Sequence, residues 1–201
     1  MKKLFAGLCA LGLSLSLNVN AISIDLIADQ AAVNVGDNLA VQVRISGLND
    51  VSTPSLGAYD VNFNYDSSLF NFTSIVWGDS ALGNQLDVNN FGSLQDSNSG
   101  LDWLRAVEIS VDDAIDLELL QAGEFTLFSI LLNATAIGSG NFSLTANAFG
   151  DAYGNDLFID NIDSAQVNVG SLSVPEPSSL LLLIGMLAIL VLREKVSQSR
   201  Q

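Results

Sequence analysis

Histidine is absent from all 201 residues of this sequence, and its absence removes much of the common catalytic machinery. Ser–His and Cys–His pairs, in which an imidazole activates the nucleophile, are excluded. Lysine is also absent between Ile22 and Arg193, which excludes Ser–Lys dyads and Schiff-base chemistry there. A zinc site in that segment would lack its usual histidine and cysteine ligands. We therefore expect this part of the chain not to be an enzyme.

The single cysteine, Cys9, lies in an N-terminal segment that has the build of a secretory signal peptide. Lys2 and Lys3 give a positive start, a mostly apolar stretch follows, and small residues close the segment. We expect residues 1–21 to be a signal peptide that is cleaved after its last residue. The exported remainder would contain no disulfide and no thiol, so its stability would depend on its core.

Basic residues are scarce in the remainder. Between Ile22 and Ser173 there are 20 acidic residues against two basic ones, Arg44 and Arg105, a net charge of −18. Such a surface repels phosphate backbones and anionic lipid headgroups, so nucleic-acid binding is excluded. It favours solubility and attracts cations or basic partners. Residues 22–172, about 150 in number, fit one domain.

No stretch of this domain has a long helical period. Instead, apolar and polar residues alternate at period two over 39–45, 59–65, 142–148 and 165–169, with Gly- and Asn-rich turns between. Residues 124–136 are apolar on both phases, which predicts a central strand covered on both faces. Residues 112–123 allow one or two helical turns. These patterns predict an all-β fold, a single jelly-roll-type β-sandwich.

Two acidic clusters are candidates for calcium, which prefers about six to eight oxygen ligands. The first comprises Asp112, Asp113, Asp116 and Glu118. The second, which is the better candidate, comprises Asp151, Asn155, Asp156, Asp160 and Asp163. Neither cluster has the spacing of an EF-hand loop. The alternative interpretation is a solvated acidic loop beside a Gly-Asn turn.

Four aromatic side chains are candidates for stacking on sugar rings: Tyr59, Trp77, Trp103 and Tyr153. Tyr59 has apolar neighbours in the same strand phase, so we expect it to be buried. Trp77 and Tyr153 each precede a glycine at a turn. We expect these two to be the more exposed.

The C-terminal segment, residues 173–201, has three parts. Val174, Pro175, Glu176 and Pro177 form a stiff, extended spacer, because the prolines prevent a helix or strand from continuing. The apolar run 178–192 would make a helix of about 22 Å, shorter than a bilayer core of about 30 Å. Arg193 and Lys195 flank it and would hold its far end on the cytoplasmic side. We expect a short transmembrane helix; the alternative is a buried core helix.

This order of parts resembles the PEP-CTERM sorting signal of Gram-negative bacteria over residues 174–201. The resemblance implies recognition by an exosortase, a membrane-embedded peptidase or transpeptidase, with processing at or near Pro175-Glu176-Pro177. It also implies export and transient membrane insertion. The product would then reside on the outer surface or in the extracellular matrix, often in species that form biofilms. Glu194 dilutes the basic end relative to the family pattern.

The central domain carries a second resemblance. Val35-Gly36-Asp37 precedes one alternating strand, Tyr65-Asp66 ends another, and DAYGNDL follows the last long apolar stretch. This order is similar to that of cohesin-like domains and of carbohydrate-binding-module-like sandwiches over most of residues 22–170. In cohesins, the resemblance implies docking of a dockerin partner on one sheet face. No motif in this sequence places that face.

These observations predict an exported, non-enzymatic protein of the cell surface or extracellular matrix. Its β-sandwich would bind a surface protein or a polysaccharide, and an exosortase would sort and process it. One alternative is a carbohydrate-active enzyme that uses two carboxylates. The other is a cohesin-type assembly module that binds a dockerin partner.

Overall fold

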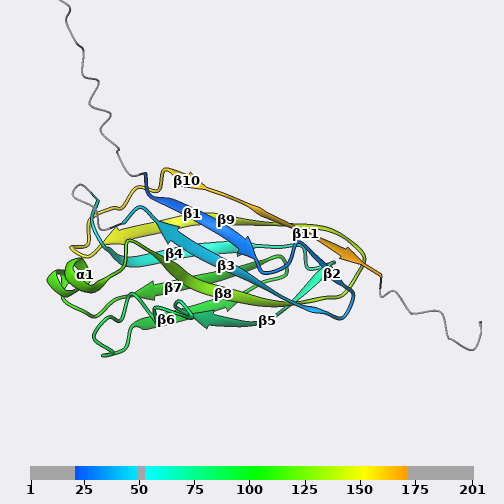
Figure 1. Ribbon diagram of the computed structural model, residues 1–201, viewed down its shortest axis with the longest axis horizontal. Coiled ribbons are helices and arrows are strands. Elements are labelled where there is room, and N and C mark those ends of the chain that lie inside the picture. Colours follow the sequence, from blue (N-terminus) through cyan, green and yellow to red (C-terminus); the bar gives the residue numbers. More distant parts are fainter. Residues whose placement is uncertain (1–20, 49–52, 172–201) are drawn as a thin grey trace, which may run out of the picture. The chain divides into compact units, whose positions relative to one another are not determined.

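Two β-sheets packed face to face form the body of the protein (Figure 1). The computed structural model describes residues 21–48 and 53–171. One sheet has five strands in the order β10-β1-β3-β8-β5, and the other has six in the order β2-β11-β9-β4-β7-β6. The strands are β1 (Ser23–Ala28), β2 (Ala32–Asn34), β3 (Asn38–Ser46), β4 (Leu56–Asn64), β5 (Phe70–Trp77), β6 (Leu94–Ser99), β7 (Trp103–Ile109), β8 (Glu124–Ala134), β9 (Gly138–Asp151), β10 (Asn161–Ile162) and β11 (Ala165–Gly170).

Alternating residues turn one side of each sheet toward the other sheet. In β3, Val41, Val43 and Ile45 are fully buried, while the residues between them are partly exposed. In β4, Val61 and Phe63 repeat this pattern. The four alternating strands predicted from the sequence are confirmed as β3, β4, β9 and β11, and so is the all-β sandwich.

Aromatic side chains from both sheets fill the space between them. Tyr59 of β4 lies against Phe128 of β8, with ring centroids 5.8 Å apart. Phe142 of β9 lies 5.1 Å from Phe70 of β5 and 5.7 Å from Phe63 of β4. Because β5 and β8 belong to one sheet and β4 and β9 to the other, the Tyr59–Phe128 and Phe70–Phe142 contacts hold the sheets together.

Strand β8 is an interior strand, as its apolar sequence predicts, but only its first half is covered on both faces. Residues 125–128 are buried in succession, and burial alternates beyond them. The connection between β5 and β6 folds over this half. The N–H of Gly78 donates to the carbonyl of Leu127 at 2.8 Å. The carboxylate of Asp79 accepts the N–H of Thr126 at 3.0 Å.

The N-terminal part of the domain contributes one strand to each sheet. β1 pairs antiparallel with β3 and parallel with β10. β2 pairs parallel with β11 in the other sheet. The chain therefore crosses between the sheets within residues 29–31, and both ends of the domain are held by strand pairing.

A short helix, α1 (Ala114–Leu120), connects β7 to β8 at one end of the sandwich (Figure 1). It agrees with the one or two helical turns that the sequence allows there. Its anchor is Leu117, which is 1% exposed. The helix therefore lies beside the ends of the six-stranded sheet, where its Leu117 lines a hollow with residues of β4, β7 and β9.

The two terminal segments lie outside the described residues. This applies to the predicted signal peptide, apart from Ala21, and to the predicted sorting segment 173–201 with its membrane helix at 178–192. Within residues 21–48 and 53–171, no helix has the length and apolar character needed to cross a bilayer.

Candidate functional site

The outer face of the six-stranded sheet carries an open hollow of about 550 Å³. Polar side chains and one tryptophan line it: Asp60, Asn62, Asn64, Trp103, Arg105 and Asn147. They belong to β4, β7 and β9, which are neighbours in the middle of the sheet. Strand alternation places these side chains opposite the core, where a binding partner can reach them.

Arg105 and Asp60 form a two-pronged ion pair across β7 and β4. Nε of Arg105 donates to Oδ1 of Asp60 at 2.8 Å, and Nη2 donates to Oδ2 at 2.6 Å. Asn147 adds a hydrogen bond to Oδ1 at 3.0 Å. The hydrogen bonds from Arg105 hold the pKa of Asp60 below its ordinary value, and the same pairing raises the pKa of Arg105. The charge of Arg105 is therefore matched within the chain.

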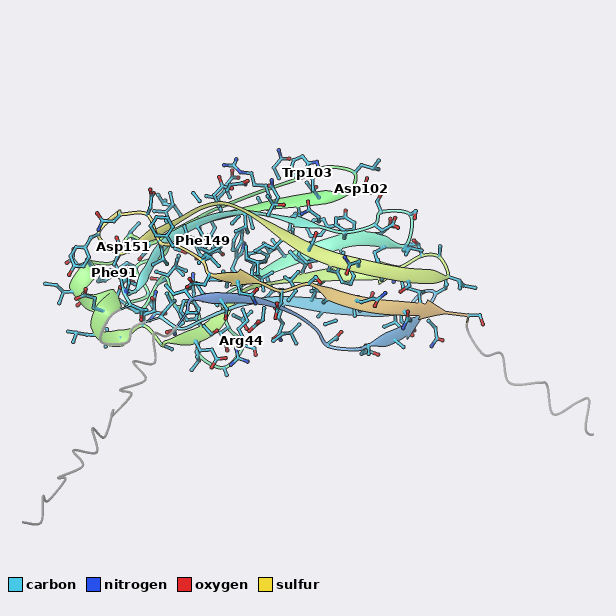
Figure 2. All side chains as sticks on the ribbon, turned by 90° about the horizontal axis from the view of Figure 1, so that it is seen from above. Arg44, Phe91, Asp102, Trp103, Phe149 and Asp151 are labelled. Atoms are coloured by element: carbon cyan, nitrogen blue, oxygen red, sulfur yellow. The ribbon has the colours of Figure 1, made fainter. Side chains whose placement is uncertain are left out.

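Trp103 lies at this hollow with 38% of its surface exposed. Figure 2 shows it at the molecular surface, on the side opposite Arg44. Its indole packs over Gly100 in the β6–β7 turn, where a Cβ atom would overlap the ring. An exposed planar ring beside fixed amide and carboxylate groups can contact an apolar side chain or a sugar ring.

The other three aromatic candidates have different environments. Tyr59 is buried as predicted, with 2% exposure, and Tyr153 is exposed as predicted, with 59%. The prediction for Trp77 is wrong. It is partly buried, and its ring meets Phe128 edge-on at 6.0 Å, because β5 continues through Trp77 before the turn begins.

A second hollow, of about 470 Å³, lies on the same outer face toward α1. Ala58 of β4 and Ala148 and Gly150 of β9 present little or no side chain there, so the strand backbones form a shallow floor. Val107 and Ile109 of β7 add apolar surface beside them. Figure 2 shows the neighbouring Phe149 and Asp151 at this end of the sandwich.

A turn at 151–156 and helix α1 border the second hollow. Oδ1 of Asp151 accepts the N–H groups of Tyr153 and Asn155, both at 2.8 Å. Burial opposes ionisation of Asp151, but the hydrogen bonds from Asn155 and from the turn backbone hold its pKa below the ordinary value. A hydrogen bond between Tyr153 and Glu118 of α1 raises the pKa of Tyr153.

A buried carboxylate, Glu108 of β7, lies beneath this face and is 0% exposed. The hydroxyl of Tyr59 donates to its Oε2 at 2.8 Å. Its Oε1 accepts the side chains of Asn84 at 2.5 Å, Ser93 at 2.5 Å and Gln95 at 2.9 Å. Burial, followed by the charge of Glu108, raises the pKa of Tyr59. One carboxylate thus joins β4, β7, β6 and the β5–β6 connection.

The residues predicted to bind calcium are Asp151, Asn155, Asp156, Asp160 and Asp163. Of these, Asp151 and Asn155 are hydrogen-bonded to each other within the turn. The carboxylate of Asp160 accepts the N–H of Ile22, and that of Asp163 accepts the side chain of Asn161. In the part of the chain that the structure describes, no three acidic residues form a group that could hold a metal ion. The calcium site remains a prediction.

The residues predicted for sorting and membrane flanking lie outside the described ranges. They are Val174, Pro175, Glu176, Pro177, Arg193 and Lys195.

Comparison with known proteins identifies the architecture. Residues 24–101 match the cohesin domain family. A type II cohesin domain from the cellulosome of Acetivibrio cellulolyticus superposes with a TM-score of 0.60 at 14% identity, covering 74% of this chain and 95% of that chain. The sandwich is cohesin-like.

Two other solved structures share this cohesin-like sandwich. One is a type I cohesin–dockerin complex from Clostridium thermocellum, with a TM-score of 0.58, 17% identity and coverage of 75% of this chain and 100% of that chain. Another is a non-cellulosomal cohesin from the archaeon Archaeoglobus fulgidus, with a TM-score of 0.54, 15% identity and coverage of 76% and 94%. No curated protein matches the chain. At these identities the likeness establishes the fold.

We predict that Glu108→Gln destabilises the domain by about 1–3 kcal/mol, because replacing one carboxylate oxygen by N–H₂ leaves at least one of the four surrounding donors without its acceptor. Urea unfolding followed by tryptophan fluorescence measures the change. The control is Glu124→Gln, which alters an exposed ion pair with Arg44 and should change stability by less than about 0.5 kcal/mol. Equal stability of the two variants would contradict the role of Glu108.

The ion pair at the first hollow gives a pH dependence. Because the pKa of Asp60 is lower in the folded state than its ordinary value of 3.8, its contribution is complete above about pH 4 and is lost as the pH falls through the folded pKa. Arg105→Gln should raise the pKa of Asp60 toward its ordinary value. A carboxyl-carbon NMR titration of both proteins measures this shift. An unchanged titration of Asp60 would show that Arg105 does not control it.

Proposed function

We propose that this chain is an exported, non-enzymatic binding module that docks a partner protein on the outer face of its six-stranded sheet. The observation that carries the proposal is the arrangement on this face. Trp103 is exposed beside the Asp60–Arg105 pair, and two hollows follow each other along β4, β7 and β9. A sheet face with an aromatic anchor and fixed polar groups has the chemistry of a specific interface.

The cohesin-like fold supports a protein as the partner. One of the similar structures is a cohesin bound to a dockerin, and another is the cohesin module of a Clostridium perfringens family 33 glycoside hydrolase. A module of this kind acts by holding its partner. The ion pair between Arg105 and Asp60 agrees with such a role, because it fixes the positions of two polar side chains on this face.

Polysaccharide is the second ligand class, and Trp103 is the observation that favours it. Its exposed ring lies at a hollow that is also lined by the amide side chains of Asn62, Asn64 and Asn147. Aromatic rings pack on the apolar faces of sugars while amides bond their hydroxyl groups. A carboxylate-dependent enzyme remains the alternative hypothesis; at this hollow, the Asp60 carboxylate is ion-paired with Arg105.

Photo-crosslinking in the native host tests the docking face. A benzophenone amino acid at Asn62 should give a discrete crosslinked product, because this position lies on the outer face of the six-stranded sheet. The same group at Gln42 of β3, on the outer face of the other sheet, is the matched control and should give none. Trp103→Ala should weaken crosslinking from Asn62 at least about tenfold.

Mass spectrometry of the crosslinked product separates the ligand classes, because it shows either peptides or sugar units. Crosslinks from Gln42 with none from Asn62 would place binding on the five-stranded sheet and refute the docking proposal. Crosslinked sugar units at Asn62 would assign the face to polysaccharide.

We further propose that residues 173–201 are a PEP-CTERM sorting signal that an exosortase recognises and processes. The support is the three-part order of the proline motif Val174 to Pro177, the short apolar run and the basic residues Arg193 and Lys195. A short helix beside a rigid proline site suits transient insertion, since it spans the bilayer core only marginally. The processed protein would reside at the outer surface or in the extracellular matrix of a Gram-negative bacterium.

Intact-mass analysis of the protein recovered from the cell surface and the medium tests the sorting proposal. We expect the chain to begin at Ile22 and to end at or near Pro175-Glu176-Pro177. Replacing Pro175-Glu176-Pro177 by three alanines should leave the tail attached. Surface protein that still ends at Gln201 in the unaltered chain would refute processing.

A further inference from the structure

The hollow beside α1 is a second feature of the docking face, and its chemistry differs from that of the Trp103 hollow. We call it the α1 hollow, the 470 Å³ depression described above. Its apolar surface comes from Ala58, Ala148, Val107 and Ile109. Ile109 is a large apolar side chain, and 45% of its surface is exposed on this outer face. Exposed apolar surface inside a depression favours an apolar group from a ligand.

The polar lining of the α1 hollow is acidic. Asp60, Asp112, Asp151 and Asp156 line it, and its lining includes no lysine or arginine. Three of these carboxylates have partners within the chain: Asp60 is paired with Arg105, Asp151 accepts the N–H groups of its own turn, and Oδ2 of Asp112 accepts the N–H of Asn89 at 3.4 Å. Oδ1 of Asp112 is buried without a hydrogen-bond partner in the described part of the chain.

Between Ile22 and Ser173 the chain has no basic side chain outside an ion pair that could enter the α1 hollow. The two arginines of this segment are both ion-paired, Arg105 with Asp60 at 2.6 Å and Arg44 with Glu124 at 2.8 Å. Between Ile22 and Ser173 there is no other basic residue. The other basic residues of the chain belong to the two terminal segments, which the proposed processing removes, so a positive charge that meets the α1 hollow would come from another molecule.

We propose that the α1 hollow receives a lysine or arginine side chain of the partner protein, and thereby selects partners with a basic docking segment. The methylene stem would lie on the floor made by Ala58 and Ala148, while the cation meets the carboxylates of Asp112 and Asp156. Lysine and arginine combine an apolar stem with a charged end, which matches an apolar floor with an acidic rim. The inference rests on the proposed docking of a protein on this face.

The hydrogen bonds within the 151–156 turn support a ready-formed border of the hollow. Asp151 accepts the N–H groups of Tyr153 and Asn155 and the side-chain amide of Asn155. A receptor that is formed before binding loses less conformational freedom when the ligand arrives. Long-range attraction between the domain, with its charge of −18, and a basic segment would also speed their encounter.

Fluorescence anisotropy with three labelled peptides tests the inference on the purified full chain. The peptides have equal length and alternate leucine with lysine, with glutamine or with glutamate. We expect the lysine peptide to bind at least about tenfold more tightly than the glutamine peptide, and the glutamate peptide to bind least. Equal binding of the lysine and glutamine peptides would overturn the proposal.

Two pairs of variants locate the binding. Ala148→Phe fills the α1 hollow and should lower the affinity for the lysine peptide at least about tenfold, whereas Ala40→Phe on β3, in the other sheet, should not. Asp156→Asn should lower the affinity for the same peptide about two- to fivefold. The same charge change on β1, Asp25→Asn, should leave affinity within about twofold, because Asp25 belongs to the five-stranded sheet.

Equal losses from Asp156→Asn and Asp25→Asn would show diffuse attraction to the acidic surface and overturn the proposal. No effect of Ala148→Phe on peptide affinity, in a protein with native circular dichroism, would also overturn it. If that variant does not fold, the two charge variants decide.

The crosslink from Asn62 separates this inference from the proposed function. A crosslink that persists unchanged in Ala148→Phe would remove the α1 hollow from docking and leave the docking face in place.

Discussion

The outer face of the six-stranded sheet depends on one buried carboxylate, Glu108, which lies beneath it. A carboxylate with no exposed surface is costly unless several donors surround it. Tyr59, Asn84, Ser93 and Gln95 supply them. Because these donors come from β4, from the β5–β6 connection and from β6, satisfying the carboxylate also fixes the positions of those segments. The edge strand β6 is exposed at all six residues, so its pairing with β7 and the hydrogen bond from Gln95 to Glu108 hold it where apolar packing does not.

The two outer faces of the sandwich have different chemistry, and this difference distinguishes the face of the six-stranded sheet as the candidate binding surface. The face of the six-stranded sheet bears Trp103, the Asp60–Arg105 pair and both large hollows. A sheet buried on one side and wet on the other normally presents scattered polar groups. Here the polar groups are bonded to one another, so they are held in place before a partner arrives. This arrangement is the reason why the proposed docking is assigned to this face.

Charge distribution links the docking face to the choice of partner. The domain carries −18, and both of its arginines are used in internal ion pairs. The proposed partner would therefore meet carboxylates and apolar surface at the α1 hollow and an aromatic ring at the Trp103 hollow. Rim charges of this kind act mainly on encounter rate and specificity, while the desolvated centre of an interface supplies affinity. The two hollows would accordingly have separate roles in one interface.

Period-two alternation was sufficient to predict the strands β3, β4, β9 and β11, the all-β sandwich and the burial of Tyr59, because strand geometry alone decides which side chains share a face. Glu108 was not singled out from the sequence, although it lies in phase with the buried residues Leu104 and Ala106 of β7, which is the signal that could have indicated an inward carboxylate. Local pattern misplaced Trp77, because strand β5 extends up to its turn glycine.

The pairing of Asp60 with Arg105, the donors around Glu108 and both hollows join residues that are far apart in the sequence. Composition by itself determined that histidine chemistry is absent and that the domain is strongly acidic. Only the tertiary structure decided which acidic residues line the two hollows of the outer face. Contacts between strands depend on sheet order and register, which no single strand encodes.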